Sequence, residues 1–130
     1  MNMGDDMGGI VNMFIVDYYK TVDGHCPVME FFESLNEKLE AKTLRTVELL
    51  EKEGNELGMP FSKHLEDGIF ELRTQLGSDI TRVLYFFMKD KTIILTHGFV
   101  KKTQKTPPEQ IKRAKEYRED YLSREEDDHE

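Results

Sequence analysis

Two spacings of apolar residues divide the chain. Between Pro27 and Leu50, apolar residues recur at intervals of three or four, which is the spacing of one buried face of an α-helix. From Ile69 onward the interval changes to two, as in a strand with one buried face. The pattern therefore predicts a helical part followed by a part built from strands.

The helical part predicts two helices that pack side by side. Pro27 suits the first turn of the first helix, and Gly54 is the expected stop of the second. Before them, the β-branched and aromatic residues of Asn12–Tyr19 predict a first strand. The stripes expected to pack in the core are Val28, Phe31, Phe32 and Leu35 in the first helix and Leu39, Thr43, Val47 and Leu50 in the second.

Three further strands are predicted at Ile69–Leu76, Ile80–Met88 and Thr92–Phe99. The turns between them are short, so we expect an antiparallel meander. After it, Thr106 and Glu109 have the spacing of a capping box, which predicts a last helix that Thr106 caps.

The resulting order is β-α-α-β-β-β-α, and it indicates an α+β domain in which a twisted antiparallel sheet packs on a helical pair. The opposite, concave face of the sheet is then left for function. We expect the domain to span residues 13–124, after a disordered segment 1–12 and before an acidic tail 125–130.

Charge is distributed unevenly along the chain. The formal net charge is -8, yet residues 89–118 hold nine Lys or Arg against three Asp or Glu, a local charge of +6. Residues 1–88 sum to -8 and residues 119–130 to -6. The acidic total argues against nonspecific DNA binding, but a concentrated basic segment can bind phosphate groups locally.

Several classes of protein are excluded by composition. The longest apolar run, Val83–Met88, is far too short to span a membrane, and the acidic, glycine-rich start does not have the pattern of a signal peptide. The single cysteine, Cys26, forms no internal disulfide, and no metal-ligand cluster or glycine-rich phosphate loop is visible. We therefore expect a cytoplasmic protein that works without a metal or a cofactor.

Cations on and around the strands are the candidate functional groups. Arg and Lys side chains that converge on one face of a meander match the geometry of phosphate and can stabilise the charge of a phosphoryl-transfer transition state. RNA supplies its own nucleophile, the 2′-hydroxyl, so cleavage needs only a base, an acid and cations. The candidate catalytic residues are Arg73, Arg82, Lys101, Lys102, His64 and His97, and the candidate RNA-binding residues are Lys63, Lys105 and Lys112.

Other interpretations of these residues stay open. Arg73 can form a surface ion pair with Glu71 two residues away, and His97 can be a packed, hydrogen-bonded strand residue. Lys112 can belong to a solvated helix face. By themselves, the residues indicate a small α+β domain with a basic patch.

Three segments carry a resemblance to a known family. GIFELR (Gly68–Arg73), RVLYFF (Arg82–Phe87) and HGFVKKTQKTPPEQIKRA (His97–Ala114) resemble the signature segments of RelE/HigB-like toxins, in particular the phage-derived, host-killing-associated branch. The resemblance runs from about Phe14 to Tyr121. It implies a compact fold like that of microbial ribonucleases. It also implies a type II toxin that cleaves mRNA in the ribosomal A site and is silenced by a helix-turn-helix antitoxin.

The resemblance also implies roles for individual residues. Arg73 matches a phosphate-binding arginine of the family, and Arg82 matches the arginine that opens the next strand. Lys101 and Lys102 lie where the family has active-site cations, while Lys63 and His64 lie where relatives carry groups for proton transfer.

The chain departs from RelE near its C-terminus. RelE uses a tyrosine there, and this chain has Gln110 or Ile111 around the equivalent place. His64, His97 and a lysine are therefore all contenders for the general base. Two alternatives to a nuclease follow: a ParE-like toxin that acts by binding, and an interaction module that docks an antitoxin.

Overall fold

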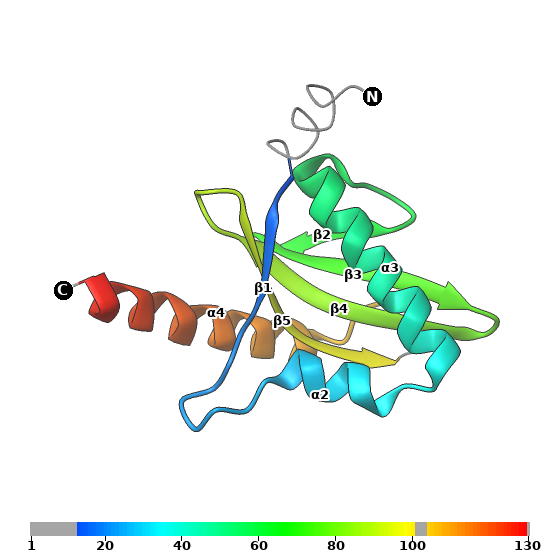
Figure 1. Ribbon diagram of the computed structural model, residues 1–130, viewed down its shortest axis with the longest axis horizontal. Helices are drawn as coiled ribbons and strands as arrows, with labels where there is room; N and C mark the ends of the chain where they lie inside the picture. Colours follow the sequence, from blue (N-terminus) through cyan, green and yellow to red (C-terminus); the bar gives the residue numbers. More distant parts are fainter. Residues whose placement is uncertain (1–12, 101–103, 130) are drawn as a thin grey trace, which may run out of the picture.

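The computed structural model describes residues 13–100 and 104–129, with side chains described as far as Glu126 (Figure 1). The predicted disordered segment 1–12 lies outside the described residues. The elements in chain order are β1 (Ile15–Tyr18), α2 (Pro27–Ser34), α3 (Glu37–Glu53), the short 3-10 helix η1 (Gly54–Glu56), β2 (Ser62–Glu66), β3 (Ile69–Leu76), β4 (Asp79–Phe87), β5 (Thr92–Val100) and α4 (Pro108–His129).

The five strands form one mixed sheet in the order β1-β5-β4-β3-β2. The α+β class and the predicted meander of β3, β4 and β5 are confirmed. Two predictions about the sheet were wrong. The sheet is not wholly antiparallel, because β1 pairs with β5 in parallel, with Ile15 opposite Thr92. It also has an additional edge strand, β2, whose charged sequence SKHLE gives no apolar alternation to detect.

Helices cover both faces of the sheet. The first core joins α2 and α3 to one face, and includes Val28, Phe32, Leu50, Leu72, Val83, Tyr85, Ile93 and Leu95. The second core joins α4 to the opposite face, through Ala114 against Ile69, Leu84, Phe86 and Ile94. In Figure 1, α4 crosses behind the sheet, while α2 and α3 lie in front. The prediction of an open opposite face is therefore wrong where α4 packs.

Local signals in the sequence explain where the helices start and stop. The Asn36 side chain accepts a hydrogen bond from the Leu39 backbone N–H at 2.9 Å, which caps the start of α3. Gly54 ends α3 as predicted, with a φ of 56° that favours glycine. A Cβ atom at Gly54 would also lie 2.0 Å from the Phe14 ring, so this stop fits only glycine.

The last helix differs from its prediction at its start. It begins at Pro108, and the Thr106 hydroxyl donates a hydrogen bond to Glu71 instead of serving the predicted cap. It continues to His129. Lys115 and Arg118 fix α4 to the turn between β2 and β3, through the Asp67 carboxylate at 2.8 Å and the Asp67 carbonyl.

A β-bulge in β5 decides which way the end of that strand faces. Leu84 is opposite His97, but the next residue of β4, Tyr85, is opposite Leu95, so Thr96 is an extra residue. Strict alternation would place His97 on the same face as Leu95. The bulge turns His97 to the α4 face, where its ring bonds Gln110.

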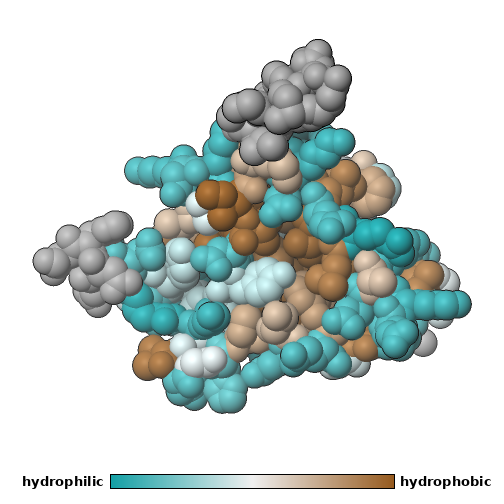
Figure 2. All heavy atoms as spheres, viewed as in Figure 1, coloured by the Kyte–Doolittle hydropathy of each residue, from teal (hydrophilic) through white to brown (hydrophobic). Residues whose placement is uncertain are grey.

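The surface on the α2 and α3 side is hydrophilic at its periphery. Apolar side chains gather in a band beside β1 and α3 (Figure 2). Val16 and Tyr18 of β1 lie on this side, where they pack half-buried against the first core. None of the described helices is long and apolar enough to cross a membrane.

The close packing of Gly98 against α2 generates a stability prediction. A Cβ atom at Gly98 would lie 2.3 Å from the Phe31 ring, so we expect Gly98→Ala to lower the free energy of unfolding by about 1–3 kcal/mol through overpacking. Denaturant unfolding measures the change. Gly58→Ala is the matched control, because nothing lies within 4 Å of its Cβ position. A Gly98→Ala variant as stable as the control would contradict the packing described here.

Candidate functional site

A cluster of charged side chains lies on the α4 face of the sheet. Arg73 in β3 and Arg82 in β4 are opposite each other in the register, so their side chains share a face. Glu71 lies two residues before Arg73 and faces the same way. Thr106, from the segment before α4, completes what we call the Glu71 cluster: Glu71, Arg73, Arg82 and Thr106.

Glu71 is the centre of this cluster. Its Oε2 lies 3.5 Å from Nε of Arg73, and its Oε1 lies 3.6 Å from Nη1 of Arg82. The Thr106 hydroxyl donates to Oε1 of Glu71 and accepts from Nη1 of Arg82 at 3.4 Å. One carboxylate therefore holds two guanidinium groups, and a hydroxyl ties them to the start of α4.

Arg82 is completely buried. Its side chain has 0% exposure, and desolvation lowers its pKa while the Glu71 charge opposes that change. Arginine keeps its charge in proteins, so a buried guanidinium needs nearby anionic and polar groups. An external ligand does not reach Arg82 in this arrangement, and the residue can act only through Glu71 and its other neighbours.

Arg73 has a different environment from Arg82. Its side chain is 17% exposed, and its contact with Glu71 is made through Nε. Within the described part of the chain, no hydrogen-bond acceptor binds the terminal nitrogens of Arg73. Those nitrogens can therefore bind an anion such as phosphate in a bidentate manner.

The remaining lysine predictions have different outcomes. Lys63 in β2 is exposed and opposite Glu71 in the register, so it lies on the same face as the Glu71 cluster. Lys105 is exposed and directly precedes Thr106, while Lys112 is exposed on α4. Lys101 and Lys102 lie outside the described residues. Lys63 therefore lies across the sheet from Glu71, and Lys105 is next in the chain to Thr106 of the Glu71 cluster.

Neither histidine is part of the Glu71 cluster. His64 is opposite Phe70 and packs against its ring at a centroid distance of 5.0 Å, which puts it on the α2/α3 face. His97 is only 4% exposed beneath α4, where Nε2 lies 2.8 Å from Oε1 of Gln110. Burial lowers the pKa of His97 to about 4, so its imidazole is neutral at pH 7.

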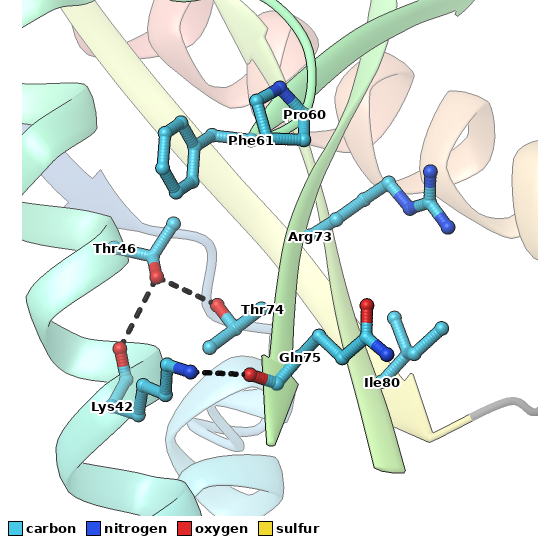
Figure 3. A pocket seen from close by; sticks show the side chains of 8 residues that line it. All are labelled: Lys42, Thr46, Pro60, Phe61, Arg73, Thr74, Gln75 and Ile80. Carbon is cyan, nitrogen blue, oxygen red and sulfur yellow. Dashed lines mark hydrogen bonds between the residues drawn. The ribbon is translucent and has the colours of Figure 1, made fainter. Parts of the chain in front are cut away.

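A pocket opens at the edge of β3, beside the cluster. It has a volume of about 240 Å³, and Figure 3 shows Lys42 and Thr46 of α3 on one side of β3 and the Arg73 side chain extending from the other. The full lining is Lys42, Thr46, Pro60, Phe61, Arg73, Thr74, Gln75 and Ile80. We call this the β3-edge pocket. Lys42 and Phe61 were not among the predicted site residues, because nothing in their local sequence indicates a role in binding.

The sequence predicted the ion pair of Glu71 but not its burial. The predicted ion pair between Glu71 and Arg73 is present, but Glu71 is 1% exposed and therefore not part of a surface pair. Its alternation with Arg73 and the apolar surroundings of Arg82 were the available signals.

Among the described side chains, no group of three or more His, Cys, Asp or Glu residues is placed to hold a metal ion.

Removing the central carboxylate should destabilise the fold. Glu71→Ala leaves two guanidinium groups in a buried environment without their shared partner, so we expect a loss of about 3–5 kcal/mol in the free energy of unfolding. Glu66→Ala, which removes an exposed partner of Lys115, should cost little. Equal effects of the two substitutions in denaturant unfolding would show that the Glu71 cluster is not structural.

The neutral state of His97 predicts a pH dependence of stability. The pKa of His97 is about 4 in the folded protein against an ordinary value of 6.5, so the unfolded state binds the proton first. The contribution of neutral His97 to the free energy of unfolding is complete above pH 6.5 and is lost as the pH falls towards 4. We expect a loss of about 2 kcal/mol between pH 7 and pH 5 that is absent in His97→Gln. Urea unfolding of both proteins at both pH values tests this, and parallel curves would refute it.

Comparison with known proteins supports a family within the RelE/ParE-like toxin superfamily, without distinguishing the RelE/HigB branch. The family model described as phage-derived protein Gp49-like (DUF891) matches residues 30–119, which include the later part of α2, all of α3 and of β2 to β5, and the first half of α4. A search of curated proteins gave no match. The chain belongs to the phage-derived Gp49-like family (DUF891), a branch of the RelE/ParE-like toxin superfamily.

Proposed function

We propose that the protein is the toxin of a type II toxin–antitoxin pair and that it cleaves mRNA on the ribosome without a metal ion. Membership of the Gp49-like family supports the toxin role. The observation that carries the nuclease role is the arrangement of Arg73. Its Nε forms an ion pair with the buried Glu71 carboxylate at 3.5 Å, and among the residues that the structure describes no acceptor binds its terminal nitrogens.

In this proposal, Arg73 binds the scissile phosphate. The RNA 2′-hydroxyl gives its proton to a base, and its oxygen attacks phosphorus. The bond to the 5′-oxygen then breaks, and an acid donates a proton to that leaving group. The products are a 2′,3′-cyclic phosphate and a 5′-hydroxyl. Arg73 stabilises the negative charge that develops on the phosphate oxygens.

Glu71 and Arg82 act as positioning residues in this scheme. The Glu71 carboxylate orients Arg73 through their ion pair, and Arg82 holds that carboxylate in place at 3.6 Å. Lysines are the favoured groups for proton transfer. Lys63 is exposed on the face of the cluster, whereas His64 lies on the opposite face and His97 is buried beneath α4. Lys101 and Lys102 stay candidates for the same role, and Lys105 and Lys112 for binding RNA.

A cognate antitoxin is the proposed regulatory partner, of the helix-turn-helix type that the family resemblance implies. An exposed basic site would bind RNA whenever it is free, so silencing requires an acidic or bulky antitoxin segment over it. The ribosome would supply the mRNA and hold it in place.

One observation favours a second candidate, a ParE-like toxin that acts by binding. Gln110, near the place where RelE has a tyrosine, is engaged with the buried His97. Neither residue then offers an acid or a base to RNA. A toxin of this kind would damage DNA metabolism and leave mRNA intact.

The role of Arg73 generates a functional prediction. Arg73→Ala should abolish growth arrest on induction and lower mRNA cleavage by at least about 100-fold, because transition-state charge loses its main donor. Mapping of mRNA ends after a short induction measures cleavage, and thermal unfolding checks that the variant is folded. Arg45→Ala, an exposed arginine of α3, is the control with the same charge change and should keep full toxicity.

Two results would overturn the proposal. A folded Arg73→Ala variant that is as toxic as the wild type would remove the phosphate-binding role. DNA damage with uncut mRNA in cells that express the wild type would favour the ParE-like candidate.

A further inference from the structure

The β3-edge pocket exists because β2 is shorter than β3. The two strands pair only as far as Ser62 opposite Leu72, and the last bond between them runs from the Arg73 backbone N–H to the Phe61 carbonyl at 2.7 Å. Beyond that bond, the Lys42 ammonium of α3 donates to the Gln75 carbonyl at 2.6 Å. The pocket is the space between these two contacts (Figure 3).

The floor of the pocket is polar and ordered. The Thr74 hydroxyl donates to the Thr46 hydroxyl at 2.8 Å, and Thr46 donates in turn to the Lys42 carbonyl at 3.2 Å. The Gln75 side-chain amide donates to the Gly77 carbonyl at 3.3 Å, which leaves its oxygen as an acceptor. Groups of this kind can form hydrogen bonds with the edge of a nucleobase.

The rim combines an aromatic ring with positive charge. Phe61 is 41% exposed although it is aromatic, and neighbouring Met59 is 65% exposed. Lys42 lies on α3, and Arg73 of the Glu71 cluster reaches the same pocket from the other side of β3 (Figure 3). An exposed ring beside cations is the combination that proteins use to bind single-stranded nucleic acid, by stacking the base and pairing the phosphate.

We propose that the β3-edge pocket binds one nucleotide of the RNA strand next to the scissile phosphate, with its base stacked on Phe61 and its phosphate paired with Lys42. This inference rests on the proposed nuclease function, since Arg73 belongs to both places and would mark where the strand passes from one to the other. The pocket volume of 240 Å³ is below the range of about 300–1,000 Å³ typical of small-molecule sites, and so suits a single base.

An antitoxin segment is the competing occupant, because Phe61 and Met59 are apolar. The observations favour RNA. Lys42 and Arg73 bring two positive charges to a small pocket with a hydrogen-bonding floor, whereas an apolar peptide anchor prefers a floor without polar groups.

Binding of a short fluorescein-labelled single-stranded RNA to the full chain tests the inference, with fluorescence anisotropy for affinity and NMR for the site. Phe61→Leu should weaken binding about tenfold, while Phe61→Trp, which keeps a stacking surface, should bind as well as the wild type. Lys42→Met should reduce the slope of log affinity against log salt by about 0.7, as expected for one lost phosphate contact with a single strand. Lys38→Met, on the same helix but outside the pocket, should leave that slope unchanged.

The outcomes separate the pocket from the nuclease. Loss of affinity in Phe61→Leu, together with NMR shifts at Thr46, Thr74 and Gln75, supports the pocket even if no cleavage is found. Unchanged affinity in Phe61→Leu, or shifts confined to other residues, overturns it even if Arg73→Ala abolishes cleavage. If the purified antitoxin shifts the NMR signals of Phe61 and RNA does not, the pocket belongs to the antitoxin. That result also overturns the inference.

Discussion

Burial of the Arg82 guanidinium imposes a requirement that several parts of the chain meet together. A charged group without solvent access needs an anionic partner and further polar contacts, and here the anion comes from the neighbouring strand. Glu71 meets Arg82 only because β3 and β4 pair with Arg73 opposite Arg82. A shift of that register by one residue would place Glu71 on the α2/α3 face, among apolar side chains. Thr106 adds the start of α4 to the same contact, so strand register and helix position depend on one carboxylate.

This arrangement divides the charged residues into a fixed interior and an available surface. Arg82 and Glu71 are buried and form an ion pair, while the Arg73 side chain belongs to the same cluster and is 17% exposed. A phosphate-binding arginine benefits from such support, because less side-chain entropy is lost when an anion binds. The β3-edge pocket adds an aromatic ring and a lysine beside this arginine. Arg73 lies on one side of β3 and Lys42 on the other, and both line the β3-edge pocket (Figure 3).

The histidines show how far the sequence leads towards the site. The sequence predicted that Arg73 and Arg82 can converge on one face, and the register of β3 and β4, with Arg73 opposite Arg82, brings them together there. Strict alternation gives the wrong face for His97, because the bulge at Thr96 turns its side chain to the α4 face. There α4 covers the His97 ring. The sequence also fails to separate Lys63 from His64. These neighbours lie on opposite faces of β2, a strand without an apolar pattern.

By itself, the sequence determined the α+β class, the three strands of the meander and the stop of α3 at Gly54. Each of these depends on local spacing or on a short turn, which the order of residues specifies directly. Only the tertiary structure decided that β1 runs parallel to β5, that α4 covers the second face, and that Lys42, Phe61 and Arg73 share a pocket. These features join segments far apart in the chain. Their placement depends on the packing of whole helices against the sheet, and no local pattern encodes that packing.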